Sequence, residues 1–364
     1  MLSPVYSPYA LVPERAEGIA IHTDRGVYLD TYAGIGVLPL GHGDGEVLRA
    51  IQEKSARFVH LSNYFVDPDG AWMAEQLLAQ TGGAGSVYFS NSGTEAVEAA
   101  LKAAKKSRKG SIISFEGDFH GRTLGALSVT WSPSIREPFE PLLPDCVLLP
   151  RRGDALRAFA RERAVAAVVL ECIQGNSGVL PMDGDLADAV QAVQREQGAL
   201  VVADEIQTGL GRTGSFFAYE HFGLRPDIVA MGKGLGGGLP LGATLFCGWE
   251  PFGPGDHGST FAPNPVSLAA GRAVLRRLTP EFLQEVVRKG EVLAKGLSAL
   301  PWARSVRGLG LMIGVSASDA AEVRRKAFDR RVLLNVAGGA VRFLPALTIT
   351  DAEIDEVVRL LDFS

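Results

Sequence analysis

Apolar and polar positions alternate along the chain with two different spacings. Short apolar runs rich in β-branched residues predict strands at residues 86–89, 111–115, 166–171, 199–204, 228–232 and 243–248. Between these runs, the apolar spacing predicts helices such as residues 94–107 and 186–197. Strands that alternate with helices indicate the α/β class, with a mainly parallel, doubly wound sheet.

The pattern changes after Pro265. It predicts a long helix to residue 300, a strand at residues 305–316, a helix at residues 319–329, two short strands around residues 332–335 and 340–344, and a last helix. Thr350 and Glu353 form a capping box that opens this last helix. We therefore expect a large domain at residues 41–261 and a smaller α+β domain at residues 262–364. The N-terminal segment, residues 1–40, is expected to pack with the smaller domain.

Size and charge narrow the class of partner. A length of 364 residues, against a prior of about 150 per domain, favours one large domain and a smaller one. The apolar content of 46% is ordinary for a globular protein and argues against global disorder. Lys and Arg number 36 and Asp and Glu 41, so the formal net charge of -5 predicts no broad cationic surface for nucleic acid or anionic lipid. Small molecules are the expected partners.

The cysteines and the N-terminus bear on location. Cys146, Cys172 and Cys247 are scattered and odd in number, which predicts neither a disulfide framework nor a thiolate metal site. The N-terminus lacks a basic flank followed by an apolar core, and no apolar run approaches the roughly 18 residues of a membrane span. The six histidines show no metal-ligand spacing. We expect a cytoplasmic protein with no metal site and no membrane segment.

Lys233 is the first candidate for chemistry. It is the only lysine between Lys109 and Lys289, and it follows an apolar run and enters a glycine-rich stretch, residues 234–238. Most lysines are solvated surface charges, but glycine-rich backbone can approach a ligand closely. A lysine at the exit of a buried strand has the setting of a desolvated amine, which suits a Schiff base.

Asp204 is the second candidate. It ends the predicted strand 199–204, at the carboxyl edge where parallel sheets bind their ligands. A carboxylate there can pair with a protonated ring nitrogen. Alone, Asp204 would be interpreted as an acid that caps the next turn, but Gln207 follows three residues later and Lys233 one βα-sized segment later.

Two further segments carry weaker signals. Residues 91–95 open an alanine-rich helix, and its free amides at Gly93 and Thr94 offer an anion site, although an ordinary capped helix explains the segment equally well. After another predicted strand, Phe119 could stack on a planar ring and Arg122 could hold a carboxylate. Taken singly, Phe119 would more often be core and Arg122 a surface charge.

Two glycine patterns suggest other chemistry. Residues 209–214 match the dinucleotide pattern G-x-G-x-x-G and follow a strand, but the bulky residues 215–219 make the match weak. The pair Gly232-Lys233 lacks the Ser or Thr of a P-loop, which disfavours an NTPase. His120 and His257 are expected to be structural or to neighbour a bound ring.

Together these residues resemble the class III (ω-amino) aminotransferases of the fold-type I pyridoxal-phosphate enzymes. The resemblance covers nearly the whole chain, and its strongest segments are residues 91–102, 115–123, 204–214, 231–242, 257–261 and 341–345. Within the family, the set is most similar to the acetylornithine aminotransferases. The resemblance implies the fold-type I architecture, pyridoxal 5'-phosphate as cofactor and a place in arginine biosynthesis.

The resemblance also implies roles for the matching residues. Lys233 would hold the cofactor as a Schiff base and shuttle a proton, while Asp204 would keep the pyridine nitrogen protonated. The other cofactor-binding residues would be Ser92, Gly93, Thr94, Phe119, His120, Ile206, Gln207 and Thr260. Thr260 would reach the phosphate of a neighbouring subunit, which implies a homodimer with shared active sites. The substrate-binding residues would be Arg122, Arg342 and Glu171, with Arg122 taking the distal carboxylate of glutamate.

One departure from the family pattern bears on the substrate. Residues 171–179 read ECIQGNSGV, so Asn176 stands where the family has a glutamate that masks the carboxylate-binding arginine. Ala262-Pro263 also replaces a glycine pair. These changes leave the cofactor residues intact and bear only on which substrate is bound.

The resemblance implies transfer of the terminal amino group of N-acetylornithine, or a similar ω-amine, to 2-oxoglutarate, giving a semialdehyde and glutamate. Ornithine, 4-aminobutyrate and acetyl-lysine-type aminotransferases are the alternatives within the class. An aminomutase fits less well, because Arg122 and Arg342 together suit a dicarboxylate. From other classes, an NAD(P)-dependent oxidoreductase and a catalytically idle cofactor-binding domain stay open.

Overall fold

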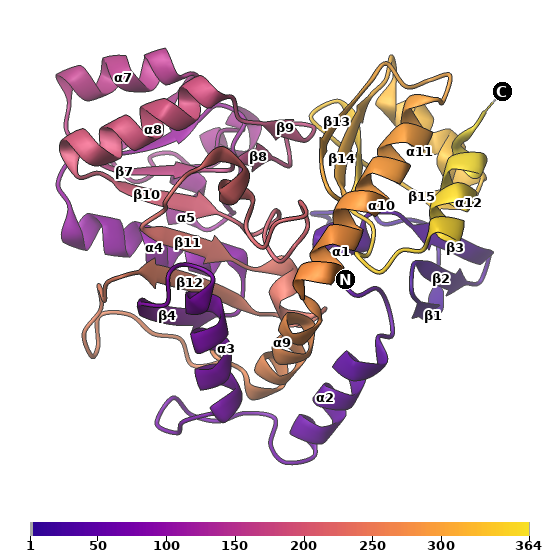
Figure 1. Cartoon of the computed structure of the whole chain (residues 1–364), viewed down its shortest axis with the longest axis horizontal. Helices are drawn as coiled ribbons and strands as arrows, with labels where there is room; N and C mark the ends of the chain where they lie inside the picture. The colour runs from indigo at the N-terminus through magenta and orange to yellow at the C-terminus, as the bar shows by residue number, and fades with distance from the viewer. Residues whose placement is uncertain (1–2, 364) are drawn as a thin grey trace.

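A computed structural model describes residues 3–363 (Figure 1). Residues 1 and 2 of the expected N-terminal segment and residue 364 of the expected smaller domain lie outside that range. The largest sheet in it has seven strands in the order β4-β12-β11-β10-β7-β5-β6. These strands are β4 (Gly85–Ser90), β12 (Gly242–Cys247), β11 (Ile228–Met231), β10 (Leu200–Asp204), β7 (Val165–Leu170), β5 (Ser111–Phe115) and β6 (Cys146–Leu149). Only β12 runs against the others, which confirms the mainly parallel sheet.

Helices cover both faces of this central sheet. One face packs on α3 (Pro68–Ala79), α7 (Gly153–Glu162), α8 (Gly184–Gln197) and α9 (Pro265–Arg277). The other face packs on the alanine-rich α4 (Gly93–Ser107) and on α5 (Leu124–Ser128). Because successive strand residues point to opposite faces, the wholly buried β7 supplies both cores. The sheet is therefore doubly wound, as the pattern predicts.

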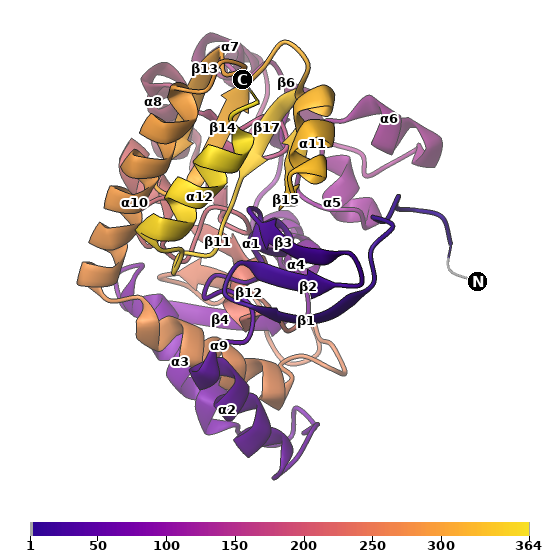
Figure 2. The same ribbon diagram turned by 90° about the vertical axis from the view of Figure 1, so that its right-hand side faces the viewer.

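Two four-stranded sheets lie beside the central one. The N-terminal strands β1 (Pro13–Glu17), β2 (Ala20–Thr23) and β3 (Gly26–Asp30) form a meander that pairs in parallel with β15 (Val332–Leu333), as Figure 2 shows. The other sheet has the order β13-β14-β17-β16, with β13 (Ser305–Leu309), β14 (Met312–Ser316), β17 (Ala340–Phe343) and β16 (Asn335–Ala337). Three helices pack on it: α10 (Pro280–Ser298), α11 (Ala320–Asp329) and α12 (Asp351–Leu361).

Shorter elements complete the chain. They are α1 (Ala33–Gly36), α2 (Gly45–Ser55), α6 (Pro133–Arg136), η1 (Glu137–Phe139), η2 (Ala218–Phe222), η3 (Lys233–Gly236), β8 (Ile173–Gln174) and β9 (Leu180–Pro181). Among the described residues, no helix is long and apolar enough to cross a membrane. The domain boundaries at residues 40 and 261 stay a prediction.

Two predicted elements were wrong in extent. The expected helix 265–300 is two helices, because Thr279 accepts a hydrogen bond from the Phe282 amide and caps a new helix that begins at Pro280. The expected strand 305–316 is a hairpin that turns at Gly310, whose φ is +53°. The short strands expected around 332–335 and 340–344 are three, namely β15, β16 and β17. The last helix and its capping box at Thr350 are confirmed.

Candidate active site

The carboxyl ends of the parallel strands meet at one edge of the central sheet and enclose a cavity. The cavity has a volume of about 260 Å³. It is lined by Gly93, Thr94, Phe119, His120, Gly121, Arg122, Glu171, Asp204, Ile206, Gln207 and Lys233. Apart from Gly121, all of them are residues that the sequence singles out as site candidates.

Lys233 follows β11 directly after Gly232 and begins η3. Its φ of +42° lies in the left-handed region, which costs a non-glycine residue energy and is found mostly at functional positions. Burial lowers the pKa of the Lys233 amine, and the charges of Asp204 and Glu171 only partly oppose the shift. A larger fraction of this amine is therefore unprotonated near neutral pH than in a surface lysine, so it is available as a nucleophile and as a proton acceptor.

Asp204 is held from behind by His120. The His120 Nδ1 lies 2.7 Å from Asp204 Oδ2, and its Nε2 lies 3.2 Å from Ser114 Oγ and 3.6 Å from Asp118 Oδ2. Burial disfavours the charged imidazole, but Asp118 and Asp204 outweigh burial and raise the pKa of His120 to about 10. A protonated His120 thus donates to Asp204 and fixes its carboxylate at the cavity wall.

The first turn of α4 forms another part of the wall. Ser92 caps the helix by accepting a hydrogen bond from the Glu95 amide. A Cβ on Gly93 would lie 2.7 Å from Ile206, and a Cβ on Gly232 would lie 3.0 Å from the Gly93 backbone. Glycine at both positions therefore lets the start of α4 approach the segments that carry Ile206 and Lys233.

Phe119 and Arg122 lie together at the mouth of the cavity. The Arg122 guanidinium lies over the Phe119 ring, 5.7 Å from its centroid. Arg122 is exposed, and Phe119 is half-buried. The stack supports the aromatic ring from outside and leaves the guanidinium accessible to a ligand.

Glu171 joins two loops of the site. Its Oε2 accepts from the Phe119 amide at 2.9 Å, and its Oε1 accepts from the Gly175 amide at 3.2 Å. Burial raises the pKa of Glu171 to about 8, and the charges of Asp118 and Asp204 act in the same direction. This buried carboxyl therefore fixes backbone positions, and sequence spacing alone did not indicate that role.

Arg342, on β17, is 3% exposed and does not line the cavity itself. Its Nη1 donates to Gln207 Oε1 at 3.0 Å, to Asn176 Oδ1 at 2.9 Å and to the Gly175 carbonyl at 3.0 Å. Nε and Nη2 both donate to Asn335 Oδ1. Burial lowers the pKa of Arg342 to about 10, with the charge of Glu171 opposing. Asn335 could not be predicted from the sequence, because no motif marks it.

Thr260 is exposed and does not line the cavity of its own subunit. Its loop is held close to the site by Ser259, whose Oγ accepts from Asn91 Nδ2 at 3.2 Å. The Ser259 carbonyl accepts from Asn63 Nδ2 at 2.7 Å. The structure thus gives Thr260 no role within one chain, and its expected role toward a second subunit stays a prediction.

The G-x-G-x-x-G segment has a packing role. A Cβ on Gly211 would collide with Leu283, and a Cβ on Gly214 would collide with Val287, both on α10. No helix follows the last glycine directly, since the next element, η2, begins at Ala218. The glycines therefore admit a helix of this chain instead of a pyrophosphate, which argues against the dinucleotide interpretation.

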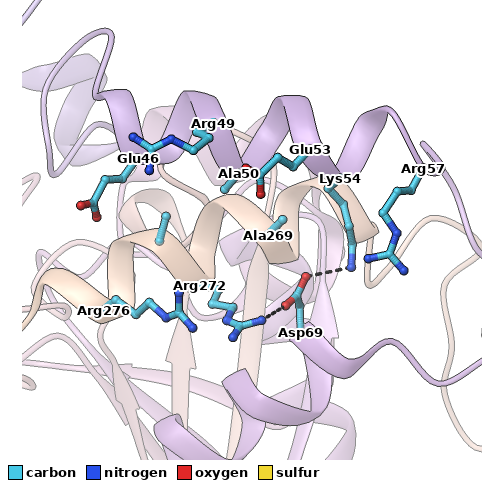
Figure 3. Close-up of a pocket in the computed structure, with 11 residues that line it drawn as sticks. Glu46, Arg49, Ala50, Glu53, Lys54, Arg57, Asp69, Ala269, Arg272 and Arg276 are labelled. Carbon is cyan, nitrogen blue, oxygen red and sulfur yellow. Dashed lines mark hydrogen bonds and ion pairs between the residues drawn. The ribbon is translucent and has the colours of Figure 1, made fainter.

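A larger hollow of about 590 Å³ lies between α2 and α9 (Figure 3). Asp69 accepts from Lys54 at 2.8 Å and also from Arg272, and Lys54 donates to Asp67 at 2.8 Å. Arg272 lies over the Trp72 ring. The hollow shares no lining residue with the cavity around Lys233. We interpret the charged side chains around this hollow as an ion network that fixes α2 against α3 and α9.

Comparisons with known proteins show which proteins this chain is similar to. A sequence profile described as Aminotransferase class-III matches residues 2–362. The acetylornithine aminotransferase of Methanopyrus kandleri is 44% identical over 372 residues, covering 97% of this chain and 93% of its own. The N-acetylornithine aminotransferase structure from Stenotrophomonas maltophilia has a TM-score of 0.82 at 32% identity, covering 98% and 95% of the two chains. The ornithine aminotransferase of Toxoplasma gondii has a TM-score of 0.91 at 29% identity, covering 99% and 91%.

Proposed function

The chain belongs to the class III aminotransferases, and on that premise we propose that it transfers the terminal amino group of N-acetylornithine, or a similar ω-amine, to 2-oxoglutarate with pyridoxal 5'-phosphate as cofactor. One observation carries the proposal: a partly buried amine, Lys233, and a buried carboxylate, Asp204, line the same cavity at the ends of neighbouring strands. A cofactor with an aldehyde and a basic ring nitrogen needs that pair of groups.

The residues of the cavity fit this cofactor. The amides of Gly93 and Thr94, at the start of the 15-residue helix α4, suit its phosphate. Phe119 and Ile206 line the cavity and would enclose its ring, and Gln207 would reach the phenolic oxygen. When bound, the cofactor supplies an electron-poor ring that accepts the electrons released as a substrate C–H bond breaks.

The side chains of this protein perform the remaining steps. The Lys233 amine would hold the cofactor covalently, be released when the substrate amine takes its place, and then move a proton between the amine-bearing carbon of the substrate and C4′ of the cofactor. Asp204, oriented by His120, would keep a proton on the ring nitrogen. Two half-reactions of this kind give a ping-pong cycle, in which the semialdehyde formed from the donor leaves, and its amino group stays behind, before 2-oxoglutarate binds.

The two arginines support a dicarboxylate in the second half-reaction. Arg122 at the mouth of the cavity would hold the distal carboxylate, and Arg342 behind Gln207 would hold the proximal one. The named relatives favour N-acetylornithine as donor and a place in arginine biosynthesis. Ornithine is the second candidate, because the charge of Arg342 meets only neutral acceptors and stays open to an α-carboxylate.

We also propose a homodimer in which Thr260 of the partner subunit reaches the phosphate site. Large apolar side chains are exposed around the loop that carries Thr260, which is typical of an interface. They are Val59, Tyr64, Phe65, Val66 and Phe261. The three cysteines are free, which supports a cytoplasmic location.

A spectroscopic donor screen tests the proposal. The purified protein with its cofactor should absorb visible light, and a good amino donor should bleach that band. We expect the fastest bleaching with acetylornithine in a comparison with ornithine, acetyl-lysine, 4-aminobutyrate and glutamate. Borohydride should trap the cofactor on the peptide that contains Lys233. A label on another lysine, or a cofactor band that no donor bleaches, would contradict the proposal.

A further inference from the structure

The residues on the two sides of the candidate site come from different sheets. The distance between the two sides therefore depends on how those sheets contact each other. Asp204 ends β10 of the central sheet, and Gln207 follows it. Arg342 lies on β17 of the C-terminal sheet and meets Gln207 at 3.0 Å. Whatever fixes the exit of β17 against the segment after β10 also fixes Arg342 relative to Lys233.

Arg212 lies at the contact between these two sheets. It is 3% exposed, and its Nη1 donates to the Pro345 carbonyl at 2.6 Å and to the Leu311 carbonyl at 3.0 Å. Pro345 follows β17 and lies three residues after Arg342, while Leu311 immediately precedes β14, the neighbour of β17. One side chain from the segment after β10 thus holds two strands of the other sheet.

The backbone around Arg212 tightens the same contact. The Leu311 amide donates to the Arg212 carbonyl at 3.0 Å. A Cβ on Gly310 would lie 2.7 Å from that carbonyl oxygen, so the β13–β14 turn reaches it only because residue 310 is glycine. Arg212 also lines a small void together with Ile206 and Gln207, which both line the active-site cavity. The contact around Arg212 therefore adjoins the candidate active site.

We propose that Arg212 is a positioning residue for carboxylate binding, which holds the exit of β17 and so sets Arg342 at the distance from Lys233 that a dicarboxylate requires. This inference rests on the proposed function. Arg212 does not line the cavity around Lys233, and its guanidinium bonds to backbone carbonyls and not to Arg342, so it acts through Pro345 and the strand before it.

A buried cation is an expensive way to hold two carbonyl groups, which argues for a demand on geometry. Burial lowers the pKa of Arg212 to about 9, yet the group stays charged at neutral pH. Charged donors form shorter and stronger hydrogen bonds to carbonyl oxygens than neutral donors do. The contact therefore restrains Pro345 more firmly than apolar packing of the same volume could.

The test compares dicarboxylate binding with chemistry that needs no second carboxylate. Arg212→Met should weaken calorimetric binding of glutarate, an unreactive dicarboxylate, by about tenfold in the holoenzyme. The visible cofactor band and the rate of bleaching by a simple alkylamine should stay near wild type. Arg212→Lys, which keeps a charged donor but only one compact group, should give a smaller loss and serves if the Met variant does not fold.

Trp302→Phe is the matched control. Trp302 Nε1 donates to the Leu361 carbonyl at 2.9 Å, so this variant also removes a side-chain donor from a carbonyl of the C-terminal part. It should leave glutarate binding unchanged at a similar loss of stability. Unchanged glutarate binding in both Arg212 variants would overturn the inference, and so would an equal loss of glutarate binding, cofactor absorbance and alkylamine rate. If wild type itself neither binds glutarate nor reacts with glutamate, the proposed function fails instead.

Discussion

The two walls of the candidate site are built in different ways. The first wall carries Asp204, Glu171 and Lys233, which lie at the carboxyl ends of neighbouring strands of one sheet. The second wall carries Arg342, which comes from another sheet and meets the first wall through Gln207. The geometry of the first wall is set within a single sheet, whereas that of the second depends on how two sheets pack.

The walls also differ in their charges. In the first, His120 pairs with Asp204 and lies near Asp118, so opposite charges meet in the protein interior. In the second, the Arg342 guanidinium meets the side-chain oxygens of Asn176, Asn335 and Gln207, which are neutral. The first wall pairs an imidazolium with a carboxylate, while the Arg342 guanidinium of the second wall hydrogen-bonds only to neutral oxygens of the described residues.

Lys233→Ala should break the first wall most completely. Both the covalent hold on the cofactor and the proton carrier are lost, so turnover should fall to background in a coupled assay of glutamate formation. Alanine is smaller than lysine and introduces no steric clash, so the circular dichroism spectrum and the elution volume should match wild type. Substantial turnover in the purified variant would show that another base does the work.

Asp204→Asn should have the next largest effect. The amide keeps the shape of the side chain but cannot hold a proton on the ring nitrogen, and each pKa unit lost from the ring corresponds to about 1.4 kcal/mol. A loss of several units should slow the first half-reaction by about a thousandfold or more in stopped-flow single turnover. A near wild-type rate would make Asp204 a structural acid at a strand end.

Asn176→Glu should change the second wall without touching the first. A carboxylate at this position can pair with the Arg342 Nη1, which now lies 2.9 Å from Asn176 Oδ1, and so mask the charge. The ratio of first-half-reaction rates for glutamate and acetylornithine should then fall, by about 5-fold to 150-fold for a coupling of 1–3 kcal/mol. Asn176→Gln is the neutral control. An unchanged ratio would mean that Arg342 does not bind substrate.

The smallest expected effect is on stability, and it comes from the first wall. The pKa of His120 is raised from 6.5 to about 10, so its stabilising contribution is complete below pH 6.5 and is lost as pH rises toward 10. The raised pKa values of Glu171, about 8, and Glu205, about 7, place their changes at lower pH. Above pH 8, His120 is therefore the main contributor of these three.

Urea unfolding of the cofactor-free protein checks this sign. Between pH 8 and pH 9.5, the unfolding free energy of wild type relative to His120→Asn should fall by up to about 2 kcal/mol, at about 1.4 kcal/mol per pH unit. His120→Asn should show a flatter dependence over the same range, even though it is less stable at pH 7. Parallel curves for the two proteins would mean that His120 is neutral in the folded state.

Sequence alone predicted the first wall well. Asp204 and Lys233 directly follow apolar runs, and the carboxyl ends of parallel strands have to meet at one edge. The partners of Arg342 could not be found in the same way. Asn335 and Gly175 lie far from each other in the chain, and only the packing of β17 against the loop after β7 brings them together.

The wrong elements and the false motif have separate physical causes. Thr279-Pro280 is a helix-start signal that the continuous apolar spacing of residues 265–300 outweighed in the prediction. The G-x-G-x-x-G pattern reflects a lack of space for a Cβ at Gly211 and Gly214 and their positive φ values of +80° and +93°. A pyrophosphate and a packed helix make the same demand, so sequence could not distinguish them.

Helix α9 has a consequence for how the protein folds. Its Leu268 and Leu275 belong to the same core as Met73 and Val201, although it lies beyond residue 261 in the chain. Leu278, just after α9, packs on this core and also on the core beneath the C-terminal sheet. In a fragment that stops at residue 261, the part of the core that Leu268 and Leu275 cover in the full chain would be exposed to water. The two halves are therefore expected to fold and unfold together, as one cooperative transition.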